Sequence, residues 1–267
     1  MKTLETILKD LLAEGVDKLH VLADFEGTLT KEFVDGKKVL SIVYVLRDCP
    51  GYLSTEYQEE ANNLFDEYHP YENNLSLSIE NRSAKMHEWW TKHFNLLIKS
   101  GLKKEHIEKV ATSGIVQFRD GAKAFLKLTH DFGIPVIICS ASGLGEAVSI
   151  FCKYEGVDFD NIHYLTNSFK WNDRGEAVGV TEPIIHSLNK NETLIHEVLG
   201  LSEIIKGRNN VLLLGNSPGD LEMSKGSEAK KVVTVAFVDS EAGESEWRKG
   251  FDIVEKDYVE INKVLSV

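Results

Sequence analysis

An apolar run that ends in two carboxylates constrains this chain more than any other feature. The segment LHVLA at residues 19–23 is apolar apart from one histidine, and DFEGTLT at residues 24–30 follows it directly. A short, nearly continuous apolar run predicts a strand buried on both faces of a parallel sheet, here over about residues 19–25. Ligands of open α/β sheets bind just outside the carboxyl ends of the strands. We therefore expect Asp24 and Glu26 at a ligand-binding edge.

These two carboxylates have two interpretations. A carboxylate nucleophile beside a second carboxyl group can combine covalent chemistry with proton transfer. Alternatively, Asp24 caps a loop amide in an Asx-type turn and has a structural role. This stretch alone does not separate the two interpretations, so the rest of the chain has to decide.

The composition excludes some classes of partner. The chain has 267 residues, of which 42% are hydrophobic, and a formal net charge of −12. This length fits one large domain, or a core with a smaller inserted domain. The acidic balance argues against a broad surface for a nucleic acid polymer. A local positive pocket or a metal ion can still bind a phosphorylated small molecule.

Cysteine usage and hydropathy indicate a cytoplasmic protein. Cys49, Cys139 and Cys152 have no paired spacing, which favours a reducing compartment, and Cys139 lies in an apolar run typical of a core. No apolar stretch reaches the roughly 18 residues of a membrane span. Charged residues from Glu5 onward interrupt the N-terminus, which therefore predicts an amphipathic helix rather than a signal peptide.

The remaining periodicity predicts alternating helices and strands around an inserted segment. Turn signals at Asp35-Gly36 and Pro50-Gly51 lie in a mixed region, residues 31–53. Helices are expected at 3–14, 54–69, 78–99, 102–113, 120–132 and 146–156, and strands at 134–139, 162–166, 211–215, 232–238 and 251–254. A hairpin is expected around residues 172–175. We interpret residues 31–115 as a mostly helical insert placed to cover the loop after the first strand.

Two further strands end in loops suited to phosphate or metal. Ser140-Ala141-Ser142-Gly143 follows the strand at 134–139 and opens a helix, where free amides and a hydroxyl can bind phosphate or simply cap the helix. Asn216-Ser-Pro-Gly-Asp220 follows the strand at 211–215 and offers oxygen ligands of the kind that Mg²⁺ prefers.

These segments resemble, in order, the four motifs of the haloacid dehalogenase (HAD) superfamily. Asp24-x-Glu26-x-Thr resembles the first motif, Asp-x-Asp-x-Thr, with Glu26 in place of the second Asp. Ser140 matches the serine of the second motif. Lys190, in an Ile-His-x-x-Asn-Lys pattern, matches the third motif as the cytosolic pyrimidine 5′-nucleotidase family has it. Asn216 stands where the fourth motif has its first Asp, and Asp220 is retained.

The insert carries a further point of resemblance. The segment HEWWTKH at residues 87–93 is similar to the Glu-Trp-Trp/Tyr-Thr-Lys stretch in the cap helix of these nucleotidases, where the glutamate contacts the nucleotide. The resemblance thus implies that Glu88 binds substrate. A plain helix that buries Trp89 or Trp90 and exposes Glu88 and Lys92 as an i,i+4 pair is the alternative.

The resemblance also implies the chemical roles. Asp24 attacks phosphorus and forms an aspartyl-phosphate, while Glu26 protonates the leaving oxygen and later deprotonates water. Mg²⁺ is bound by Asp24, the backbone carbonyl of Glu26 and Asn216. Substrate oxygens are bound by Ser140 and Lys190. The loop residue Ala141 joins them in the substrate site.

We therefore expect an α/β protein with a HAD-like Rossmannoid core, a parallel sheet and a mostly helical cap inserted after the first strand. The core comprises residues 1–30 and 116–267, and the cap residues 31–115. The expected function is Mg²⁺-dependent hydrolysis of nucleoside 5′-monophosphates, with pyrimidine nucleotides as the expected substrates. Two alternatives stay open, a nucleotide- or phosphate-binding protein with little turnover and a phosphatase for another small phosphomonoester. The preferred base and the oligomeric state are left open.

Overall fold

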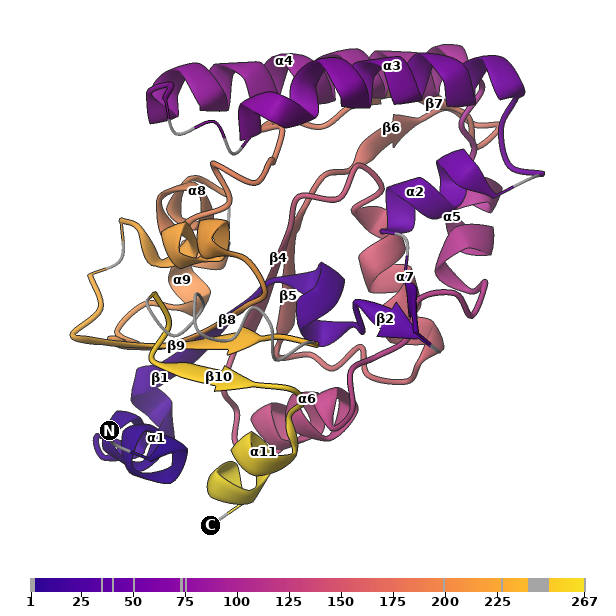
Figure 1. The fold of residues 1–267 in the computed structure, drawn as a ribbon. Helices are drawn as coiled ribbons and strands as arrows, with labels where there is room; N and C mark the ends of the chain where they lie inside the picture. Colours follow the sequence, from indigo (N-terminus) through magenta and orange to yellow (C-terminus); the bar gives the residue numbers. More distant parts are fainter. Residues whose placement is uncertain are drawn as a thin grey trace.

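A six-stranded parallel sheet forms the centre of the fold (Figure 1). The computed structural model describes residues 3–34, 36–39, 41–49, 51–72, 74, 76–198, 200–226, 228–239 and 250–266. In spatial order the strands are β10 (Ile253–Glu255), β9 (Lys231–Phe237), β8 (Asn210–Gly215), β1 (Leu19–Ala23), β4 (Val136–Ser140) and β5 (Ile162–Thr166). The chain is therefore an α/β protein built on a parallel sheet, as the sequence predicts.

Strand β1 lies in the middle of the sheet because it is apolar on both faces. All five of its residues are buried, and Ala23 pairs with Ile138 of β4 and Leu214 of β8. Alternate strand residues belong to two separate apolar clusters, Val21 to one and Leu22 to the other. The strand ends at Ala23, two residues earlier than expected, because the chain then turns through residues 25–29.

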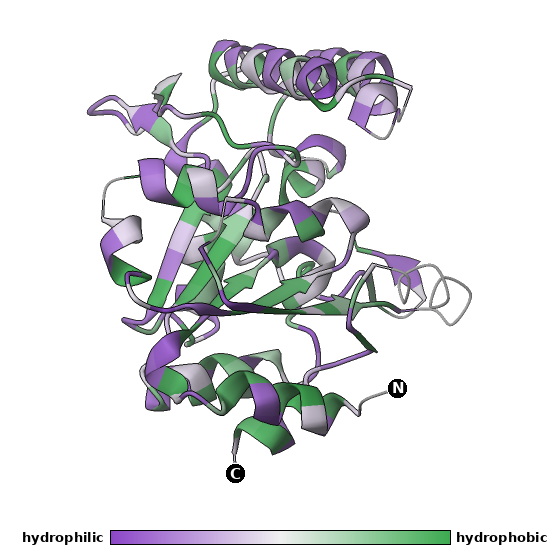
Figure 2. Ribbon diagram, turned by 90° about the vertical axis from the view of Figure 1, so that its left-hand side faces the viewer, coloured by the Kyte–Doolittle hydropathy of each residue, from purple (hydrophilic) through white to green (hydrophobic). Residues whose placement is uncertain are grey.

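Helices cover the sheet and its edges. Figure 2 shows apolar residues concentrated in the strands, while the surrounding helices carry polar residues as well. These helices are α1 (Leu4–Leu12), α6 (Ala122–Asp131), α7 (Glu146–Tyr154), α8 (Glu192–Glu197), α9 (Leu201–Ile204) and α11 (Val259–Leu265). Short 3₁₀ turns span Val16–Lys18 and Pro218–Ser224. No helix in the described part of the chain is both long and apolar enough to cross a membrane.

The predicted insert is mostly helical. It contains the hairpin β2 (Phe33–Val34) and β3 (Lys37–Lys38), followed by α2 (Ile42–Asp48), α3 (Thr55–Glu72), α4 (Ile79–Lys99) and α5 (Lys104–Ala111). Helices α3 and α4 lie side by side at the top of Figure 1. Helix α2 was not expected, and α3 continues past its predicted end at residue 69 and through Pro70. Asp35 and Pro50, two of the predicted turn residues, lie outside the described residues.

The two chain segments that connect the insert to the sheet pair with each other. Thr30 and Phe118 form an antiparallel bridge, and the Arg119 amide donates to the Leu29 carbonyl at 2.8 Å. The predicted hairpin at residues 172–175 is also present, between β6 (Phe169–Trp171) and β7 (Ala177–Val180). Strand β7 contacts α4, so the hairpin supports the insert from the core side.

A buried polar pair lies between α3 and α4. The Tyr57 hydroxyl and His93 Nε2 are 3.0 Å apart, and their side chains are only 1% and 4% exposed. Burial, together with the nearby charge of Arg47, lowers the pKa of His93 to about 4. The histidine is therefore neutral in the folded protein at neutral pH.

This buried histidine predicts a pH-dependent stability. A histidine in the unfolded chain titrates near 6.5, so between pH 6.5 and 4 the unfolded state binds a proton that the folded state does not. Stability from His93 is present above about pH 6.5 and is lost as the pH falls toward 4. We expect urea unfolding to show a loss on the order of 1–2 kcal/mol from this residue at pH 5. The His93→Phe variant should show a shallower pH slope, and equal slopes would contradict this origin.

Candidate active site

Four predicted side chains meet at the carboxyl edge of the sheet. Asp24 follows β1, Ser140 ends β4, and Asp220 lies in the turn after β8. Lys190, from the loop before α8, reaches this edge with its Nζ 2.5 Å from Asp24 Oδ1 and 2.7 Å from Asp220 Oδ1. Each of the four is less than 10% exposed.

The electrostatics of this cluster keep a cation beside the candidate nucleophile. Burial raises the pKa of the Asp24 carboxyl and Lys190 opposes that shift, with a net upward change. Burial alone would lower the pKa of Lys190, but Asp220 and Asp24 raise it above its ordinary value. Lys190 therefore stays protonated, and with both carboxylates ionised the three groups carry a net charge of −1.

Asp220 shapes its own loop as well as binding Lys190. Its Oδ2 accepts hydrogen bonds from the amides of Asn216 and Ser217, each at 2.9 Å, and from the Ser217 hydroxyl at 3.0 Å. Its other oxygen faces Lys190. With both oxygens engaged, Asp220 is a positioning residue in this arrangement.

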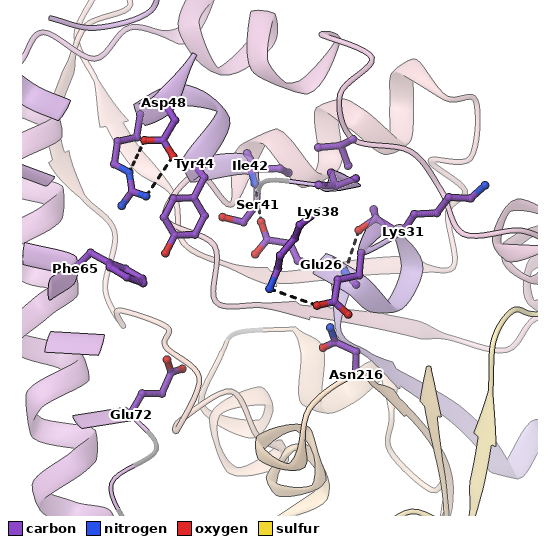
Figure 3. Close-up of a pocket in the computed structure, with 16 residues that line it drawn as sticks. Glu26, Lys31, Lys38, Ser41, Ile42, Tyr44, Asp48, Phe65, Glu72 and Asn216 are labelled. Carbon is purple, nitrogen blue, oxygen red and sulfur yellow. Dashed lines mark hydrogen bonds and ion pairs between the residues drawn. The ribbon is translucent and has the colours of Figure 1, made fainter. Parts of the chain in front are cut away.

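Glu26 links the loop after β1 to the helical insert. Its Oε1 accepts a hydrogen bond from the Ile42 amide, at the start of α2, at 2.8 Å (Figure 3). Burial raises the pKa of the Glu26 carboxyl to about 7, although the Ile42 amide works in the opposite direction. A carboxyl group with such a pKa is available in both protonation states near neutral pH.

A buried arginine binds the backbone carbonyls of the loop after β1. Arg119 is 3% exposed, and its guanidinium donates to the carbonyls of Gly27 at 2.5 Å and Thr28 at 3.3 Å. The remaining donors contact the Asp239 carboxylate, at 2.6 and 3.3 Å, and the Lys256 carbonyl at 2.8 Å. All five N–H groups of the guanidinium are thereby used.

Glycine is required at position 27 for two reasons, its backbone conformation and the close approach of the Asn216 side chain. Its φ is +79°, a left-handed value that favours glycine. A Cβ atom there would lie 2.1 Å from Nδ2 of Asn216. Asn216 therefore packs directly on Gly27, in the loop that follows Asp24, and lines the same cavity as Glu26 (Figure 3).

The loop after β4 folds back on the serine at the end of the strand. Ser140 is 1% exposed, and its Oγ accepts a hydrogen bond from the Ser142 amide at 3.1 Å. Ala141 and Ser142 line a cavity that also reaches Glu26. Because Ser140 Oγ is the acceptor in this hydrogen bond, its own O–H group is available to donate to a phosphate oxygen.

Two adjoining cavities lie between these loops and the insert. Their volumes are about 610 and 250 Å³. They share residues from both parts of the structure: Glu26, Ser41, Tyr44, Arg47, Phe65 and Glu72. The larger also reaches Asn216, and the smaller also reaches Ala141 and the aromatic face of α4. Figure 3 shows Phe65 and Glu72 across the larger cavity from Glu26 and Asn216.

Glu88 is not brought together with the other predicted site residues. Its Oε1 accepts from the Tyr68 hydroxyl at 2.7 Å and lies 3.1 Å from Lys92 Nζ, and its Oε2 pairs with Lys85 at 2.8 Å. Helical periodicity explains this position, because Met86 and its neighbours three, four and seven residues on line the smaller cavity, whereas Glu88 faces Tyr68. Glu88 and Lys92 thus form the i,i+4 pair that was the alternative interpretation of this segment.

Glu72 is the acidic residue of the insert that lines both cavities, and sequence reasoning missed it. It lies three residues beyond the predicted end of its helix, after Pro70. Glutamates and aromatic residues at helical spacing mark this helix as amphipathic. That pattern does not indicate which carboxylate reaches a cavity.

The oxygen donors near Asp24 fit a magnesium ion. The candidates are the Asp24 carboxylate, the Glu26 carbonyl and the Asn216 amide, all hard oxygen ligands. Within the described ranges, no three His, Cys, Asp or Glu residues form a metal-binding group. A magnesium site here would therefore combine one carboxylate with neutral oxygens. The net negative charge around Asp24 gives a reason for a cation when a phosphate dianion enters.

Comparisons with known proteins agree with this geometry. Residues 27–266 match the family model described as pyrimidine 5′-nucleotidase (UMPH-1). The human 7-methylguanosine phosphate-specific 5′-nucleotidase is 32% identical over 95% of this chain and 85% of its own length. Its Drosophila melanogaster counterpart is 28% identical over 94% of this chain and 79% of its own length.

Solved structures show the same architecture. Cytosolic 5′-nucleotidase IIIB, in a crystal structure with bound cytidine, matches 97% of this chain and 88% of its own with a TM-score of 0.84 at 25% identity. A phosphoserine phosphatase, solved as a phospho-aspartyl intermediate analogue, shares the fold with a TM-score of 0.55 at 20% identity, over 92% of this chain and 97% of its own. The chain therefore belongs to the pyrimidine 5′-nucleotidase family of HAD-fold hydrolases and is an enzyme of the 5′-nucleotidase class.

Proposed function

We propose that this enzyme hydrolyses nucleoside 5′-monophosphates with the help of Mg²⁺ and uses Asp24 as its nucleophile. The observation that carries the proposal is the Asp24 carboxylate, which is placed at the sheet edge by β1 and held by buried Lys190. The adjoining cavities, with aromatic walls, are suited to a base. The names of the relatives support the same class of substrate.

The side chains divide the chemistry between them. Thr28 donates to Asp24 Oδ2 at 3.1 Å and Lys190 binds Oδ1, so the carboxylate is oriented before substrate arrives. An Asp24 oxygen attacks phosphorus, the bond to the 5′ oxygen breaks, and Glu26 gives that oxygen a proton. Glu26 then takes a proton from the water that hydrolyses the aspartyl-phosphate.

Other groups bind the phosphate. In this proposal the Lys190 ammonium, the Ser140 hydroxyl and the Ala141 amide contact its non-bridging oxygens. Mg²⁺, held by Asp24, the Glu26 carbonyl and Asn216, would offset phosphate charge. Residues 31–115 act as a cap over a core of residues 1–30 and 116–267, and the paired connections at Thr30 and Phe118 join the two.

We propose pyrimidine nucleotides as substrates, the class named in the description of the matching family model. Arg47 lines the cavity, with its guanidinium 4.0 Å from the centroid of the Tyr44 ring. Its charge is paired with the Asp48 carboxylate, which accepts from Arg47 Nε at 2.9 Å, so Arg47 adds no unpaired positive charge to the cavity. The second candidate is a 7-methylguanosine monophosphate, the substrate named for several relatives. The aromatic walls and the Glu72 carboxylate favour it, because both attract a cationic base.

Replacement of the nucleophile tests the mechanism. Asp24→Asn keeps the size of the side chain and removes its nucleophilic charge. We expect phosphate release from CMP and UMP to fall by about a thousandfold or more, while circular dichroism and thermal unfolding show a folded protein. A folded variant with a near-normal rate would show that another residue attacks. Wild-type protein that binds these nucleotides without releasing phosphate would instead favour a binding protein.

Matched substitutions of two glutamates test the base site. Glu72→Gln should lower kcat/KM for CMP or UMP by roughly five- to tenfold and leave para-nitrophenyl phosphate little changed, since the latter has no nucleobase. Glu88→Gln is the control on the neighbouring helix, and it should leave the ratio of the two substrates unchanged. If Glu88→Gln selectively lowered kcat/KM for CMP or UMP and Glu72→Gln did not, the contact with the base would be assigned to Glu88.

The uncharged side chain of Asn216 predicts weak binding of Mg²⁺. Asn216→Asp adds a negative charge, which offsets more of the cost of partly dehydrating Mg²⁺. We expect a several-fold lower Mg²⁺ concentration at half-maximal rate, and tighter Mg²⁺ binding by calorimetry. Asn216→Ala is the matched control that removes the ligand oxygen, and it should weaken Mg²⁺ binding in both measurements. Identical titrations for all three proteins would mean that residue 216 does not contact the ion.

A further inference from the structure

The histidine of β1 is paired in the interior and takes no part in the proposed chemistry. His20 is 2% exposed, and its Nε2 lies 3.2 Å from Oε1 of Glu192, which is also 2% exposed. The other ring nitrogen, Nδ1, lies 3.1 Å from the backbone carbonyl of Arg208. Neither His20 nor Glu192 lines the two cavities of the active site. A histidine and a glutamate thus form a buried pair outside the reacting centre.

The two acceptors around the ring determine how many protons this pair holds. A backbone carbonyl only accepts, so Nδ1 of His20 carries a proton. A hydrogen bond between Nε2 and Oε1 needs a second proton, on either atom. The pair therefore has no net charge, whether the ring and the carboxyl group are both charged or both neutral. The Arg208 carbonyl is itself held in place, since the guanidinium of the same residue donates to the Leu19 carbonyl at 2.7 Å.

His20 lies on the same face of the sheet as the candidate nucleophile. Successive side chains of a strand alternate between its two faces, so His20, Leu22 and Asp24 share one of them. Asp24 continues this alternation past the end of β1, because its backbone is extended and its amide donates to the Leu214 carbonyl at 3.0 Å. One face of the strand therefore carries a buried polar residue near its start and the nucleophile at its end.

The segment that carries Lys190 is attached to this face at both ends of the strand. The Lys190 ammonium contacts Asp24 at the carboxyl end. Glu192, two residues later, contacts His20 near the amino end. The apolar cluster that contains Leu22 also includes two residues of α8, Leu194 and Ile195. Two polar contacts and an apolar one together fix this segment against β1.

We propose that His20 and Glu192 are positioning residues, which hold Lys190 where its ammonium contacts Asp24 and the substrate phosphate. The inference rests on the proposed function for the contact with phosphate, whereas the contact with Asp24 is present in the structure. One residue separates Glu192 from Lys190, so a shift of Glu192 moves the backbone that carries the ammonium. A small displacement of a group at the reacting centre can lower the rate strongly.

Two substitutions at position 192 test this role. Glu192→Leu removes the hydrogen bond to His20, and we expect kcat/KM for CMP or UMP to fall by roughly tenfold or more, with weaker competitive inhibition by inorganic phosphate. Glu192→Gln keeps a hydrogen bond, because its amide N–H can donate to Nε2 while Nδ1 still donates to Arg208. This variant should retain most of the wild-type activity. An equal loss in both variants would overturn the proposal.

A double variant covers the case in which Glu192→Leu does not fold. His20→Phe combined with Glu192→Leu replaces both partners with apolar side chains, so no unpaired polar group of the pair stays buried, and a folded protein is expected. The contact that positions Lys190 is still missing, so the loss in kcat/KM should again be roughly tenfold or more. Wild-type activity in this folded double variant would contradict the inference.

Asn210→Leu is the control for a general loss of stability. Asn210 is fully buried at the start of β8, at the end of the sheet opposite the reacting edge, and its amide donates to the Leu11 carbonyl at 3.0 Å. Its replacement should lower the temperature of thermal unfolding and leave kcat/KM and phosphate inhibition unchanged. If activity instead fell with unfolding temperature in the same way in Asn210→Leu and Glu192→Leu, the pair would only support the fold.

Nuclear magnetic resonance tests the contact without substrate turnover. Long-range ¹H–¹⁵N correlation of the wild-type protein should show a proton on Nδ1 of His20, and an unprotonated Nδ1 would overturn the assigned hydrogen bonds. The ammonium signal of Lys190 should be alike in wild type and Glu192→Gln, and shifted or broadened in the double variant; an unchanged signal there would contradict positioning. If these signals behave as expected but wild-type protein releases no phosphate from nucleotides, the proposed function fails while the positioning of Lys190 at Asp24 stands.

Discussion

The contact of one lysine with two carboxylates organises the site. Lys190 reaches Asp24 and Asp220 from a loop that belongs to neither strand, and all three side chains are buried. A buried charge needs a partner, so each member of the cluster holds the others in place. The same contact brings together three segments, the loop after β1, the turn after β8 and the loop before α8. The Asp24 carboxylate is thereby oriented by groups of the protein alone.

Rigidity of the loop after β1 follows from groups that do not touch substrate. Arg119 uses its five donors on two loop carbonyls and on partners near the end of the chain, and its amide joins the paired connections to the insert. Gly27 supplies the left-handed turn and the space that Asn216 occupies. The positions of Asp24 and Glu26 therefore depend on residues far away in the sequence, which is how a scaffold keeps a reacting group in place before substrate binds.

The sequence predicts the core of this protein better than its insert. Strands such as residues 19–23 are buried on both faces, so their apolar runs stand out, and the polar residues after each strand converge at one edge of the sheet. In the insert, helical spacing shows where α3 and α4 lie. It does not show that Glu88 turns toward Tyr68 while Glu72 reaches the cavities. That difference depends on how α3 packs against α4, a tertiary contact, and on a helix that continues through Pro70.

The structure gives a reason for glutamate at position 26, where the first HAD motif has aspartate. The carboxylate reaches the Ile42 amide at the start of α2, so a core loop and the insert share a hydrogen bond at the reacting centre. One more methylene than aspartate gives the side chain this reach. The Glu26 carboxyl group is therefore positioned jointly by the two parts of the molecule. Movement of the insert relative to the sheet would release the carboxyl group from Ile42, so in the proposed mechanism proton transfer by Glu26 depends on the position of the insert.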